Sequence, residues 1–148
     1  MSGATKGGKF SHDKGRRGEQ QTAHELRVAL GSGVIVRRGA QSREGRDEPD
    51  VVVEGRPWWI EVKTWGLRKS WNDHVAALHQ AEHACLESDD PSRIAWAVVR
   101  ETRRPPMVVA RITSLIAISA GQPDPLHYGG MIAKVTWASI LVWLAQWK

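Results

Sequence analysis

Apolar residues recur along the chain with two different periods. Alternating or continuous apolar runs of about four to eight residues predict strands, whereas apolar residues spaced three and four apart predict amphipathic helices. Strands and helices succeed one another over most of the length, which is typical of an α/β fold. The expected strands are residues 34–38, 50–54, 58–65, 93–100, 106–112 and 131–136, and the expected helices are residues 19–30, 67–87, 114–120 and 137–148.

The N-terminal segment follows neither period. Residues 1–14 combine lysines with Gly, Ser and Thr and are expected to form a disordered basic tail. Residues 15–148 are then expected to form a single domain, because a chain of 148 residues suits one hydrophobic core. No apolar run reaches the roughly 20 residues that cross a bilayer. With no apolar core of a secretory signal, and Cys85 as the single cysteine, we expect a cytoplasmic protein without a membrane partner.

Three charged residues interrupt two strands that otherwise read as core. If the connecting turn is centred between Gly55 and Arg56, Asp50 lies directly across from Glu61. Lys63 lies on the same face as Glu61, because side chains alternate along a strand. Two carboxylates at this spacing destabilise a bare sheet. A hard divalent cation such as Mg²⁺ resolves the conflict and supplies a water nucleophile.

A third carboxylate precedes the two strand acids. Ala23, Leu26 and Leu30 form the inward stripe of the first expected helix, and Glu19 lies on the same stripe. An inward acid requires a partner, and Glu19 is therefore a candidate for the same site. The alternative is that Asp50 is a turn residue and that the strand acid and lysine form a solvated pair on an exposed face.

The spacing of these residues resembles a known nuclease pattern. Pro49-Asp50, followed after ten residues by Glu61-Val62-Lys63, resembles the PD-(D/E)xK nuclease superfamily. The longer stretch from Lys14 to Trp65 is similar to the archaeal-type Holliday junction resolvases and their phage relatives. It has a Lys-Gly start, a helix-opening Glu, a strand ending in Arg, a Ser-bearing loop, Pro-Asp and Glu-x-Lys. The resemblance implies a restriction-endonuclease-like core, a central mixed β-sheet flanked by helices on both faces.

The resemblance also implies a set of site residues. The implied catalytic residues are Glu19, Asp50, Glu61, Lys63 and the loop serine Ser42, and the implied metal ligands are Glu19, Asp50, Glu61 and the backbone carbonyl of Val62. The implied cofactor is Mg²⁺, for which Mn²⁺ is expected to substitute. The chain departs from the usual pattern in its long loop between Ser42 and Asp50 and in the large Trp65 after the lysine, and both departures bear on the choice of substrate.

The implied activity is hydrolysis of DNA phosphodiesters at four-way junctions by a homodimer, in the cytoplasm of the host if the gene is carried by a phage. The last helix, with Trp143 and Trp147, offers one surface for that dimer, and ordinary core packing is the alternative for these tryptophans. Two further functions stay open. The same chemistry can act on forks, flaps or duplex DNA, or the fold can serve as a non-catalytic DNA-binding module.

Charge supports a polyanionic partner. The formal net charge is +5 and the isoelectric point is about 9.8, which favours nucleic acid. The glycines of the chain lack the fixed spacing of a nucleotide-binding loop, so no nucleotide cofactor is expected. Arg103 and Arg104 lie in an expected turn and fit a solvated face as well as a DNA contact. The residues expected to contact DNA phosphates are Lys14, Arg16, Arg17, Arg37, Arg38, Arg43 and Arg46.

Overall fold

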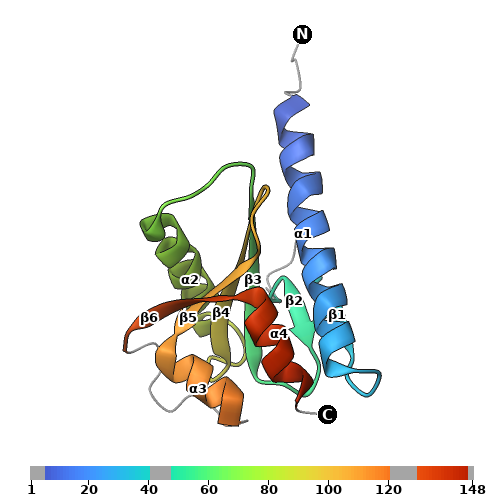
Figure 1. Cartoon of the computed structure of the whole chain (residues 1–148), viewed down its shortest axis with the longest axis vertical. Coiled ribbons are helices and arrows are strands. Elements are labelled where there is room, and N and C mark those ends of the chain that lie inside the picture. The colour runs from blue at the N-terminus through green and yellow to red at the C-terminus, as the bar shows by residue number, and fades with distance from the viewer. Residues whose placement is uncertain (1–5, 41–47, 121–129, 147–148) are drawn as a thin grey trace.

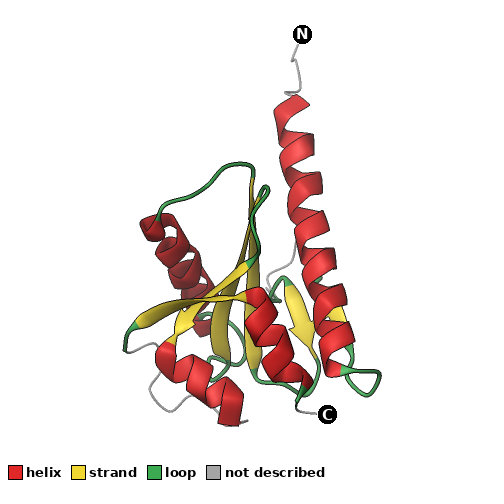
Figure 2. Cartoon of the chain, in the orientation of Figure 1, coloured by secondary structure: helices red, strands yellow, loops and turns green. Residues whose placement is uncertain are grey.

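A six-stranded sheet in the order β1-β2-β3-β4-β5-β6 forms the centre of the fold, with helices on both faces (Figures 1 and 2). Neighbouring strands are antiparallel except β3 and β4, which run parallel. The computed structural model describes residues 6–40, 48–120 and 130–146. The elements are α1 (Lys6–Leu30), β1 (Val36–Arg38), β2 (Val51–Val53), β3 (Trp58–Trp65), α2 (Trp71–Leu86), β4 (Ile94–Glu101), β5 (Met107–Arg111), α3 (Ile112–Ala120), β6 (Ile132–Thr136) and α4 (Trp137–Ala145).

The expected fold class is confirmed. The sheet is mixed, and its helices cover it on two sides, which is compatible with a restriction-endonuclease-like core. All six expected strands and all four expected helices are present, and most boundaries differ by one or two residues. The hydrophobic period therefore predicted the elements correctly, because each buries one apolar face against a neighbour.

Strand β3 divides its side chains between the two faces as alternation requires. Trp58, Ile60 and Val62 enter the large core that the sheet forms with α1, α3 and α4. Trp59 and Trp65 point to the other face and pack with residues of α2 in two smaller clusters.

Helix α1 begins much earlier than the sequence predicted. We expected a disordered tail over residues 1–14 and a helix from Glu19, and both boundaries were wrong, because residues 6–14 are already helical. Figure 1 shows these first turns extending beyond the rest of the fold. The residues that follow are fixed by packing, and adding turns to an existing helix is far easier than starting one. Gly31, with a φ of 82°, ends the helix as predicted.

Helix α2 begins later than the expected start at residue 67. Ser70 and Asp73 form a capping box in which each side chain accepts a hydrogen bond from the backbone of the other, and this fixes the first turn. Leu78 and Cys85 are buried on the inner face of the helix, whereas Trp71 is 44% exposed. Trp71 lies in the first turn of the helix, which projects beyond the core.

Helix α4 packs across the core beside α1. It buries Trp137, Ile140 and Leu144, and Trp143 is half-buried against the same core. Core packing is therefore the main role of Trp143, while Trp147 lies outside the described residues. None of the helices in the described part of the chain has the length and apolar character required to traverse a bilayer.

Candidate active site

The two strand acids face each other as predicted. Val51 pairs with Ile60 in the β2–β3 register, so the next position on each strand places Asp50 across from Glu61. The turn between the strands contains Gly55 with a φ of 75°, a conformation that suits glycine. A local turn therefore determines the register, and with it the approach of the two carboxylates.

Backbone and side-chain donors hold both acids in place. Asp50 Oδ2 accepts a 2.8 Å hydrogen bond from the Val62 amide. Glu61 Oε1 accepts a 3.0 Å hydrogen bond from the indole Nε1 of Trp59. Sequence reasoning missed this contact. The available signal was the spacing of two residues on one strand, which makes such side chains neighbours.

Burial and the repulsion between neighbouring carboxylates raise the pKa values of Asp50 and Glu61. Burial is the main cause that raises the pKa of Asp50, and the charge of Glu19 adds to it. Burial and the Asp50 charge raise the pKa of Glu61 to about 8. The interaction between the two carboxyl groups lowers the pKa of Asp50 and raises the pKa of Glu61, so Glu61 holds a proton more readily than Asp50. Two neighbouring carboxyl groups whose pKa values lie above the ordinary range are typical of functional sites.

Lys63 lies near both acids without forming an ion pair with either. Its charge lowers the pKa of Asp50 and of Glu61, and its side chain is half-buried. An ammonium group in this position, close to the acids but outside their hydrogen bonds, is placed to stabilise negative charge on a bound phosphate.

Glu19 lies close to the pair but is bonded elsewhere. The residue is only 8% exposed, and Arg38 Nε at the end of β1 donates to its Oε2. In the described part of the chain, no three His, Cys, Asp or Glu side chains are gathered into one metal-binding group. The structure thus brings Asp50 and Glu61 together, and leaves Glu19 at the margin of their site with an arginine as its partner.

The Asp50–Glu61 pair fits a hard divalent cation. Two opposed, partly buried carboxylates with raised pKa values are disfavoured as two charges, and a cation between them would remove that penalty. The Val62 carbonyl would add an oxygen ligand on the side of Asp50, because the N–H and C=O of one residue in a strand face the same neighbour. Mg²⁺ completes its shell with water, so three protein oxygens suffice.

The residues expected to bind DNA separate into three groups. Lys14 is half-buried, and Arg16 and Arg17 are exposed on α1. Arg37 and Arg38 are engaged within the protein, Arg38 by Glu19 and Arg37 by Glu48 and Glu54. Predictions for Ser42, Arg43 and Arg46 lie outside the described residues.

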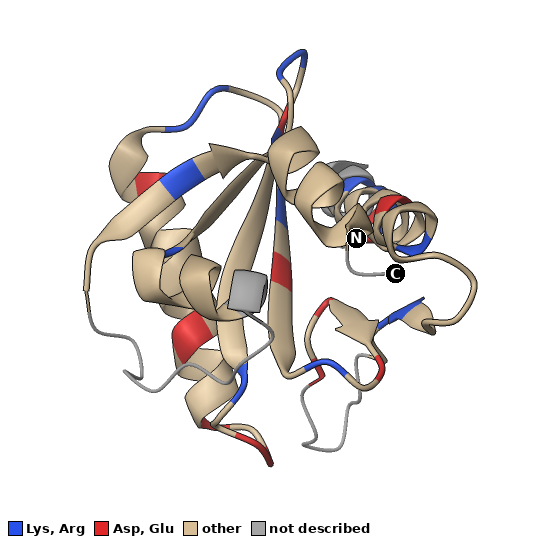
Figure 3. Ribbon diagram, turned by 60° about the horizontal axis from the view of Figure 1, so that its bottom comes forward, with Lys and Arg blue, Asp and Glu red and all other residues tan. Residues whose placement is uncertain are grey.

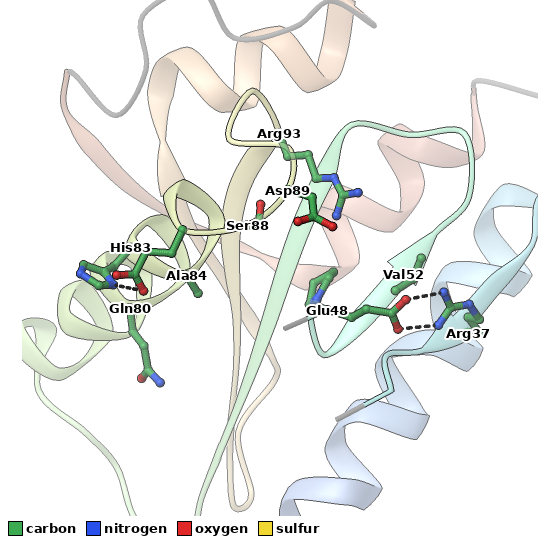
Figure 4. Close-up of a pocket in the computed structure, with 11 residues that line it drawn as sticks. Arg37, Glu48, Val52, Gln80, His83, Ala84, Ser88, Asp89 and Arg93 are labelled. Atoms are coloured by element: carbon green, nitrogen blue, oxygen red, sulfur yellow. Dashed lines mark hydrogen bonds and ion pairs between the residues drawn. The ribbon is translucent and has the colours of Figure 1, made fainter. Parts of the chain in front are cut away.

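A cavity of about 580 Å³ adjoins the candidate site, between β1–β2 and the C-terminal half of α2. Pro49 and Val52, on either side of Asp50 in the chain, contribute to its lining. Figure 4 shows Arg37 and Glu48 facing each other in this cavity, with two hydrogen bonds of 2.8 and 2.9 Å. This pairing holds the pKa of Glu48 at about 2, so the arginine keeps a charged partner at neutral pH and is not free for phosphate.

Comparison with known proteins returns no relative for this chain. No known protein family matches the sequence, and neither a curated protein nor a solved structure shows significant similarity to it.

Proposed function

We propose that the protein is a metal-dependent endodeoxyribonuclease that hydrolyses phosphodiesters of branched DNA, with four-way junctions as its substrate. The observation that carries this proposal is the opposed Asp50–Glu61 pair with Lys63 on the same face. Like charges are tolerated in such a place when a cation is bound there, and the resemblance of the Pro49–Lys63 spacing to PD-(D/E)xK nucleases supports the same chemistry.

The side chains of the site have distinct tasks in this reaction. Asp50, Glu61 and the Val62 carbonyl would hold Mg²⁺, which supplies Lewis acidity and a water of lowered pKa when bound. Hydrogen bonds from Val62 N–H and Trp59 Nε1–H orient the two carboxylates. Lys63 stabilises the charge that builds on the phosphate oxygens as water attacks. The reaction is a direct hydrolysis without a covalent enzyme intermediate, so the proton of the attacking water leaves to solvent or to the released oxygen.

A cleavage assay with matched substrates tests the proposal. Purified protein with Mg²⁺ is incubated with a four-way junction, a fork, a flap and a linear duplex of the same sequence. Symmetric nicking of the junction at a much higher rate than of the linear duplex is expected. Equal cutting of all four substrates would support the nuclease chemistry but refute the selectivity for four-way junctions. Binding without cutting at any Mg²⁺ or Mn²⁺ concentration would favour a non-catalytic DNA-binding module.

We further propose that the protein acts as a homodimer, because a four-way junction presents two strands in symmetric geometry. An apolar groove of about 350 Å³ between α3, β6 and α4 supports this, with Val142 65% exposed beside Trp143. Sedimentation of the wild type and of Val142→Glu tests the assignment. Loss of a dimer only in the variant is expected, and a wild-type monomer at cleavage-competent concentrations would contradict it. The reducing cytoplasm is the proposed compartment, since the chain has a single cysteine, Cys85, and it is buried.

A further inference from the structure

Three segments that are far apart in the sequence meet at the end of the sheet where β3 and β4 finish. Because these strands are parallel and Trp65 pairs with Glu101, the β3–α2 connection and the β4–β5 turn leave the sheet at the same edge. The Lys69 amide donates a 2.8 Å hydrogen bond to Glu101 Oε1 and ties the connection to β4. Helix α1 reaches the same edge, where Lys14 Nζ donates to Thr102 Oγ1 at 3.2 Å.

Cations gather on all three segments. Figure 3 shows blue segments in the connection and in the turn, while the opposite end of the sheet carries both red and blue segments. Within the described part of the chain, no carboxylate forms an ion pair with these cations except Glu101, which lies 3.9 Å from Arg104. We call this surface the basic edge, and its residues are Lys14, Arg17, Arg68, Lys69, Arg103 and Arg104.

The cations of the basic edge are accessible to a partner, and one of them has an unusual backbone conformation. All except the half-buried Lys14 are exposed. Arg103 has a φ of 61° and is the one residue other than glycine with a positive φ among the described residues. Such a conformation is unfavourable for a long side chain, and outliers of this kind concentrate at functional positions. A cleft of about 290 Å³ separates α1 from the β4–β5 turn, with Lys14, Arg17 and Arg104 in its lining.

We propose that the basic edge binds the phosphate backbone of a duplex DNA arm that extends away from the cleavage point. The choice of DNA as the polyanion rests on the proposed nuclease function. Lys63 precedes Trp65 by two residues, so the edge begins about 7 Å along the strand from the candidate site. Exposed guanidinium groups match phosphate oxygens and read no sequence, which suits an enzyme that recognises the shape of a junction.

Binding measured without metal separates this proposal from the chemistry. Fluorescence anisotropy of a labelled four-way junction in EDTA is followed over a range of salt concentrations. For the triple variant Arg68→Gln/Lys69→Gln/Arg103→Gln, we expect the Kd to rise about tenfold or more. The salt slope should become shallower by about 0.9 for each phosphate that the variant no longer neutralises. Circular dichroism and thermal unfolding should match the wild type, since these side chains are exposed.

A matched pair of single variants controls for net charge. Arg103→Gln and Arg56→Gln each remove one cation from a turn, at opposite ends of the sheet. Weaker binding and a shallower slope in Arg103→Gln alone support the basic edge, and equal losses in both variants would overturn it. If the triple variant unfolds, Arg68→Gln and Arg103→Gln provide the same readout singly. If the variant binds the junction as the wild type does and the protein still cuts junctions, the basic edge is refuted and the nuclease proposal stands. If binding depends on the basic edge but no junction is cut, the nuclease proposal is refuted and the basic edge stands.

Discussion

Asp50 Oδ2 accepts a 2.8 Å hydrogen bond from the backbone amide of Val62, the residue that follows Asp50's cross-strand neighbour Glu61. This bond fixes the aspartate against the backbone of β3, beside the second carboxyl group. The position of the acid therefore depends on strand geometry and does not depend on a flexible rotamer. Substitutions at the site can accordingly separate charge from shape.

Asp50→Asn tests the charge with little change in shape. The asparagine side-chain oxygen can still accept the Val62 hydrogen bond, so the protein should fold and bind DNA. We expect cleavage to fall at least about a hundredfold, because the variant loses a carboxylate that would hold Mg²⁺ in the proposed mechanism. Asp89→Asn, at an exposed position in the turn before β4, serves as the control and should cut normally. Persistent cleavage by Asp50→Asn would remove this residue from the mechanism.

The raised pKa of Glu61 predicts how stability varies with pH in EDTA. The folded pKa of about 8 lies above the ordinary value of 4.5, so the folded state holds the proton more tightly than the unfolded state. The stabilising contribution is complete below pH 4.5 and is lost as the pH rises to about 8. Urea unfolding of the wild type and of Glu61→Gln across this range should show a smaller decline in the variant.

Added Mg²⁺ should reverse that trend in the wild type. A cation binds the ionised pair, so its stabilising effect on unfolding is expected to be larger at about pH 8.5 than at about pH 6. Glu61→Gln should show little response to Mg²⁺ at either pH. An equal response in both proteins would place the cation elsewhere.

Trp59→Phe isolates the indole donor of Glu61. The phenyl ring retains most of the packing against α2 but cannot donate to Oε1, so the carboxylate loses a group that favours its charged form. We expect the Mg²⁺ concentration for half-maximal cleavage to rise about 10-fold to 100-fold, as for other outer-shell contacts. Trp58→Phe, on the neighbouring position and opposite face of β3, is the matched control. It should lower stability without shifting the metal dependence.

Gly39→Ala tests the close approach of the Gly39 backbone to Pro49, the residue before Asp50. A Cβ atom at Gly39 would lie 1.9 Å from the Pro49 carbonyl oxygen, and Gly39 N donates to the Asp50 carbonyl at 2.9 Å. Backbone must move to admit the methyl group, and we expect a loss of about 1–3 kcal/mol in unfolding free energy together with reduced cleavage. Gly33→Ala has open space around the added atom and should leave both unchanged. Wild-type behaviour of Gly39→Ala would show that this close approach is not required.

Patterns within the chain determined the elements, the two-sided sheet and the opposition of Asp50 and Glu61. These features are local. Alternation assigns each β3 side chain to a face, and a glycine-containing turn between adjacent strands determines their register.

Only the tertiary structure decided how distant segments meet. The partnership of Glu19 with Arg38 and the assembly of the basic edge both involve positions that no sequence period relates. The basic edge exists because β3 and β4 are parallel, which brings a connection near residue 68 beside a turn near residue 103. Such contacts depend on the packing of the whole sheet against its helices, so local propensity cannot specify them.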